Sequence, residues 1–112
     1  MTPALMKKIV AGLLLFTGGF HLAVAATTSW EHLSTGLAVF GVLYGILGFW
    51  TWFGGRSAMM AALLTASVGL GVGGLNYLQN GGPASMLAMF AIDAVVLVLG
   101  GLWIRNTPRG AS

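Results

Sequence analysis

Position 93 holds an aspartate inside the last long apolar stretch of the chain. It lies about nine residues from the start of that stretch, roughly 13 Å at 1.5 Å per residue, near the middle of a membrane span. A carboxyl group at that depth costs about 2.5 to 3.5 kcal/mol on insertion scales, so it must face protein and be neutral or paired. Asp93 therefore either fixes helix packing through hydrogen bonds or handles a proton or a cation.

Three further polar residues stand inside apolar stretches. His21 lies near the end of the first stretch and shares a helix face with Thr17, and Asn76 ends a row of small residues in the third. We expect Asp93, His21, Asn76 and Thr17 to form an intramembrane polar pocket. A histidine and an aspartate in contact offer a neutral hydrogen bond or an ion pair, and protonation of one then affects the other.

Glu31, His32 and Tyr77 are expected at the outer mouth of such a pocket. Glu31 falls in the first turn of the second predicted helix, where helix capping and solvation are the simpler explanation. A metal site would need His21, His32, Glu31 and Asp93, but no two of them have the i, i+3 or i+4 spacing of helical metal motifs. Haem ligation by His21 and His32 requires matched depths, which they lack. We predict no metal ligands, and the sequence does not identify a cofactor.

The sequence offers little support for an enzyme or for nucleic-acid binding. It has no cysteine, which excludes disulfides, thiolate nucleophiles and Cys-ligated metal clusters. No nucleophile elbow, phosphate-binding loop or pair of carboxylates is present. A lipid- or quinone-modifying enzyme that uses His21 and Asp93 as acid and base stays open, although the spacing does not require it. The five Lys and Arg residues are too scattered to follow a phosphate backbone.

The elements that must position these residues are four apolar runs. Hydrophobic residues make up 57% of the 112 residues and charged residues 6%, far from the composition of a water-soluble domain. The runs are continuous rather than alternating, which excludes a β-barrel. We predict an all-α fold, a four-helix transmembrane bundle that forms a single membrane domain over residues 1–112. Its spans are expected at about 6–26, 33–53, 58–78 and 84–104.

Short breaks separate the runs, so consecutive helices are expected to pack as antiparallel, up-down neighbours. Ser57 is a candidate N-cap for the third helix, and Pro83 stands just before the fourth. The first run begins with Lys7 and Lys8, continues with an apolar stretch and then has Ala23-Val24-Ala25, a pattern that also fits a signal peptide. We expect it to be retained as a span.

Charge predicts the orientation, because every cationic side chain falls on one side of the four runs. These residues are Lys7, Lys8, Arg56, Arg105 and Arg109. By the positive-inside rule that side is the cytoplasm, so both termini are expected there, in a multi-pass protein of a bacterial inner or plasma membrane. Aromatic residues agree, with Trp50, Trp52, Phe53 and Trp103 at the inner interface and Trp30 and Tyr77 at the outer one.

Small residues indicate the packing faces. In the second run Ser34, Gly41, Gly45 and Gly48 form one stripe, and in the third Ala62, Ala66, Gly69 and Gly73 form another. In lipid such residues let helix backbones approach closely. These stripes support ordinary bundle packing and say little about activity.

Two functions fit these observations best. The first is an accessory or structural subunit that packs within a larger membrane complex or against itself, which explains the glycines. The second is a small transporter or channel with an outward-facing pocket centred on Asp93. Small multidrug exporters with dual topology are disfavoured, since the cations lie on one side and the first run has no glutamate. The expected partners are the lipid bilayer and other membrane subunits or a second copy; the sequence identifies no substrate, partner or oligomeric state.

Overall fold

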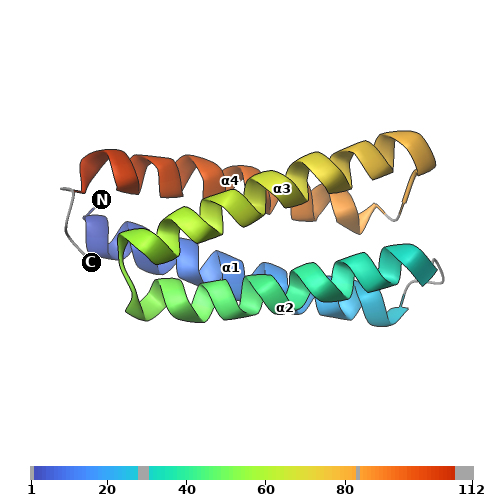
Figure 1. Cartoon of the computed structure of the whole chain (residues 1–112), viewed down its shortest axis with the longest axis horizontal. Helices are drawn as coiled ribbons and strands as arrows, with labels where there is room; N and C mark the ends of the chain where they lie inside the picture. The colour runs from blue at the N-terminus through green and yellow to red at the C-terminus, as the bar shows by residue number, and fades with distance from the viewer. Residues whose placement is uncertain (1, 28–30, 83, 108–112) are drawn as a thin grey trace.

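A computed structural model describes residues 2–27, 31–82 and 84–107, apart from the side chains of residues 31–33. The described residues form four α-helices, which are α1 (Pro3–Thr27), α2 (Glu31–Phe53), α3 (Arg56–Asn80) and α4 (Ser85–Asn106). The predicted all-α fold is confirmed (Figure 1).

Each helix is long and apolar enough to span a membrane. The shortest, α4, has 22 residues and so reaches roughly 33 Å, against about 30 Å of hydrocarbon in a bilayer. The helices cover nearly all residues of the four expected spans. Most helices also extend beyond the expected span boundaries, and α1 does so at its start and at its end. Four such helices indicate a multi-pass membrane protein.

Figure 1 shows two helical hairpins lying side by side, α1 with α2 and α3 with α4. The start of α1, the end of α4 and the α2–α3 connection lie at one end, which we call the basic end because Lys7, Lys8, Arg56 and Arg105 lie there. The α1–α2 and α3–α4 connections lie at the opposite end, which we call the far end. Successive helices therefore run antiparallel.

Glycines bring α1 and α2 into backbone contact. A Cβ atom added to Gly18 would stand 2.9 Å from the carbonyl oxygen of Gly41 and from the backbone nitrogen of Gly45. One added to Gly48 would stand 2.9 Å from the backbone nitrogen of Leu15. Only residues without a side chain permit this approach, so the glycine stripe of α2 lies against α1.

Helix α3 packs tightly against the other helices only toward the basic end. Its buried residues are Ala58, Met59, Ala62 and Ala66, all in its first half. No described residue of α3 after Ala66 is buried, and Figure 1 shows α3 diverging from α2 toward the far end. The other three helices still share a buried cluster at the far end, formed by Val24, Ala25, Leu37, Met86 and Met89. The bundle is therefore looser at the far end on the side of α3.

At the basic end, side chains donate hydrogen bonds to carbonyl groups at the C-terminal ends of helices. Lys7 donates a hydrogen bond to the carbonyl oxygen of Gly54 at 2.7 Å. Arg56 donates to the carbonyl oxygens of Ile104 and Thr107, each at 3.3 Å. These are C-terminal backbone groups of α2 and α4, which have no partner within their own helix.

Two sequence-based expectations need correction at this end. Ser57 does not cap α3, because the N-cap is Gly55, which makes no side-chain capping bond, and Ser57 already lies inside the helix. Trp103 lies at the basic end but is buried in the core rather than exposed at an interface. Arg109, Trp30 and Pro83 lie outside the described residues.

Candidate functional site

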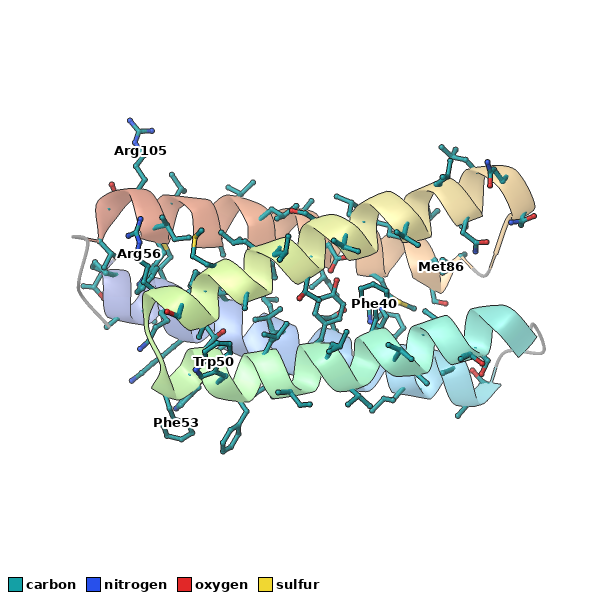
Figure 2. The ribbon with its side chains drawn as sticks, viewed as in Figure 1. Phe40, Trp50, Phe53, Arg56, Met86 and Arg105 are labelled. Atoms are coloured by element: carbon teal, nitrogen blue, oxygen red, sulfur yellow. The ribbon has the colours of Figure 1, made fainter. Side chains whose placement is uncertain are left out.

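A cavity of about 230 Å³ lies in the looser half of the bundle, between the hairpins. Every helix contributes to its wall: α1 with His21; α2 with Gly36, Leu37 and Phe40; α3 with Gly69, Val72, Gly73 and Asn76; α4 with Met86, Met89, Phe90 and Asp93. The wall is mostly apolar. Figure 2 shows Phe40 extending from α2 into the space between the hairpins.

Asp93 is the one carboxylic acid among the described side chains of this wall, and it is 2% exposed. It belongs to the core face of α4, whose buried residues follow intervals of three and four, namely Met86, Met89, Asp93, Val96, Gly100 and Trp103. Its Oδ1 atom has no hydrogen-bond partner within the described structure. A buried polar atom without a partner costs free energy.

Tyr44 is the residue that the sequence-based prediction missed. It is fully buried in the middle of α2, and its ring lies 5.1 Å from that of His21, centroid to centroid. Its hydroxyl lies close enough to the Asp93 carboxyl for the two groups to interact through charge and hydrogen bonding. Neither the Tyr44 hydroxyl oxygen nor Asp93 Oδ1 has a partner at full hydrogen-bond geometry among the described atoms. A signal existed, because Tyr44 stands on the same helix face as Gly41 and Gly48, at spacings of three and four.

The orientation of His21 is set by the preceding turn of α1. Its Nδ1 atom lies 2.6 Å from the carbonyl oxygen of Thr17 and 3.2 Å from the Thr17 hydroxyl. A carbonyl only accepts, so Nδ1 carries the hydrogen and donates it. In the neutral ring Nε2 is then a free acceptor. Thr17 is buried behind His21 and is not part of the cavity wall.

The fold thus brings together three of the four residues expected in the pocket, namely His21, Asn76 and Asp93. His21 and Asp93 face the same cavity, but Asp93 Oδ1 accepts no hydrogen bond from the His21 ring. The side-chain oxygen of Asn76 accepts a hydrogen bond from Asn80 at 2.9 Å. These three side chains therefore line the cavity without using all of their hydrogen-bonding capacity on one another.

The expected outer mouth is described only in part. The side chains of Glu31 and His32 lie outside the described structure. Tyr77 is half-buried and does not line the cavity, but its ring packs edge-on against Phe90, which does, at a centroid distance of 6.1 Å. Among the described side chains, no three His, Asp or Glu residues are grouped as metal ligands.

No family model, curated protein or solved structure matches this chain. Its function must therefore be inferred from the cavity itself. An apolar wall with a few unsaturated polar groups is the usual composition of a small-molecule site. Here the polar side chains of the wall are Asp93, His21 and Asn76.

Proposed function

We propose that the protein binds a small molecule in this intramembrane cavity, as a small transporter or channel does. The observation that carries the proposal is the placement of Asp93, a buried acid in the wall of a cavity formed by all four helices. A polar ligand accounts for both the acid and the space.

The direct test compares ligand-dependent stabilisation of the wild-type protein, Asp93→Asn and Asp93→Leu in lipid nanodiscs. A ligand at 100 times its Kd stabilises the protein by about 2.7 kcal/mol, which thermal unfolding detects. Asp93→Asn keeps the size and polarity of the side chain, whereas Asp93→Leu removes the hydrogen-bonding group. Ligand binding in the cavity is supported if both variants lose the ligand-dependent stabilisation while their unfolding transitions without ligand stay like that of the wild-type protein. An unchanged response in Asp93→Leu contradicts it.

We further propose that the basic end faces the cytoplasm, so that the cavity lies in the outer half of the membrane. The chain has no cysteine, and Ser57 and Gln79 are exposed at opposite ends of α3. In intact cells a membrane-impermeant maleimide should label Gln79→Cys and leave Ser57→Cys unlabelled. Permeabilised cells, in which both should react, provide the control. Labelling of Ser57→Cys alone in intact cells would show that the protein has the opposite orientation.

An accessory or structural role in a membrane complex is the second candidate. It is favoured by an outward face of small residues on α3, where Ser67 and Gly71 are exposed and a Cβ atom at Gly71 or Gly74 would meet nothing. Such a face allows another helix to approach closely. Purification in mild detergent should then yield companion chains or a homo-oligomer that Gly71→Leu disrupts. A monomer without companions would contradict this role.

A further inference from the structure

The cavity reaches the protein surface sideways, between α2 and α3. Gly36 and Val72 line it and are also exposed, Val72 to 59%. The exposed residues next to them are apolar, namely Val39 on α2 and Val68 and Leu75 on α3. In a membrane these side chains face lipid, so the opening faces hydrocarbon rather than water. Figure 1 shows α3 diverging from α2 toward the far end. A molecule entering here must be soluble in lipid.

The polar groups inside the cavity favour a ligand with a basic hydrogen-bond donor. From α4 comes the Asp93 carboxyl, without a described partner at Oδ1; from α1 comes His21, whose Nδ1 hydrogen is already given to Thr17. On α2 the titratable group near the acid is the Tyr44 hydroxyl, and α3 contributes the uncharged Asn76. Apart from the His21 ring, no basic side chain lines the described cavity wall. A ligand that carries a stronger base than the His21 ring would therefore complement the Asp93 carboxyl.

The remaining wall fits an aromatic ring. Phe40 and Phe90 present their rings to the cavity from two different helices. Aromatic faces attract both other rings and ammonium groups. An apolar cavity of about 150 Å³ holds benzene, so a cavity of about 230 Å³ holds in proportion about nine non-hydrogen atoms. This is one ring with a short polar arm.

We propose that the ligand is a small lipid-soluble arylalkylamine, which enters from the bilayer between α2 and α3 and binds through its nitrogen to Asp93. The proposal rests on the proposed function and specifies its ligand class. The amine arrives neutral and meets a carboxyl group that is neutral while unpaired at this depth. A proton then passes from the Asp93 carboxyl to the amine nitrogen, which leaves a carboxylate and an ammonium in contact. The pair stays neutral overall, and its hydrogen bond is charge-assisted.

Three probes of equal size separate this ligand class from others. They are 2-phenylethylamine, 2-phenylethanol and propylbenzene, which differ only in ending with an amine, a hydroxyl or a methyl group. Saturable binding to the full chain in nanodiscs is measured by calorimetry, with empty nanodiscs as the blank. We expect the amine to bind roughly ten- to a hundredfold more tightly than the alcohol, and propylbenzene to bind most weakly. In Asp93→Asn the amine should lose this advantage.

The outcomes distinguish the two proposals. If the alcohol or propylbenzene binds as tightly as the amine, the amine class is wrong while the pocket stands. If none of the three probes binds saturably, both the amine ligand and the proposed small-molecule binding are contradicted. The wild-type ranking decides between these results even if Asp93→Asn fails to fold.

A matched pair of variants tests the sideways entrance. Val72→Trp places a large ring at the opening, whereas Val98→Trp adds the same ring on α4, at a residue that is 61% exposed and does not line the cavity. We expect Val72→Trp to slow amine association at least tenfold and Val98→Trp to leave it unchanged. Equal association rates in the two variants would overturn entry between α2 and α3.

Discussion

The hydroxyl oxygen of Tyr44 on α2 lies directly against Gly69 on α3, so that a Cβ atom at position 69 would stand only 2.6 Å from it. Real Cβ atoms essentially never come so close to another atom. Tyr44 thus occupies space that only glycine leaves free. This contact lies where the tight half of the bundle meets the cavity, because Gly69 lines the cavity and the last buried residue of α3 is Ala66.

Gly69→Ala should destabilise the protein by about 1–3 kcal/mol, since the added methyl must displace the buried Tyr44 ring. Thermal unfolding in detergent measures the effect. The control is Gly71→Ala, where the methyl meets nothing, and which should be neutral or stabilising by up to about 1 kcal/mol through helix propensity. Equal stability of the two variants would show that Tyr44 is not held against α3.

Gly41 and Gly45 should respond differently to alanine, although both belong to one small-residue stripe. A Cβ atom at Gly41 would stand 2.9 Å from the Gly18 carbonyl oxygen, but one at Gly45 would meet nothing within 4 Å. Gly41→Ala should therefore cost about 1–3 kcal/mol, because backbone cannot move aside. Gly45→Ala should be tolerated. Unfolding midpoints of both variants decide this, and a greater loss in Gly45→Ala would mean that α1 and α2 pack in another register.

Arg56→Gln should lower stability by about 1 kcal/mol, because the guanidinium donates to the carbonyl oxygens of Ile104 and Thr107 at the end of α4. Arg105→Gln removes the same charge from an exposed side chain, which extends away from α4 in Figure 2. It should leave the unfolding midpoint unchanged. Hydrogen exchange of the last turn of α4 should rise in Arg56→Gln alone, and an equal rise in both would assign the effect to net charge.

Ala66→Leu should be strongly destabilising, since Ala66 is fully buried in a cluster with Leu14, Tyr44 and Val96. Overpacking of this kind costs about 1–3 kcal/mol, occasionally more. Ser67→Leu makes a similar enlargement at the next position, which is exposed, and in lipid it should be neutral. Comparable unfolding midpoints for the two leucine variants would contradict the assigned core face of α3.

The sequence pointed to part of the site because polar residues are costly in a membrane span. His21, Asn76 and Asp93 stand out in apolar runs, and the fold places all three around one cavity. Tyr44 did not stand out, since a tyrosine is largely apolar and is a common residue of interfacial aromatic belts. Its importance comes from contacts with His21 and Gly69 on two other helices. Such contacts between helices cannot be read from the sequence.

By itself the sequence determined the four helices and the clustering of cationic residues at one end, because span length and hydrophobicity are local properties that bilayer thickness selects. The tertiary structure decided which faces meet. Gly41 and Gly48 pack on α1, whereas Gly69 makes room for Tyr44 and Gly73 lines the cavity, although all four look alike in sequence. Small residues permit close approach without specifying a partner. The divergence of α3 from α2, and the cavity it creates, depends on how four helices fill their shared volume.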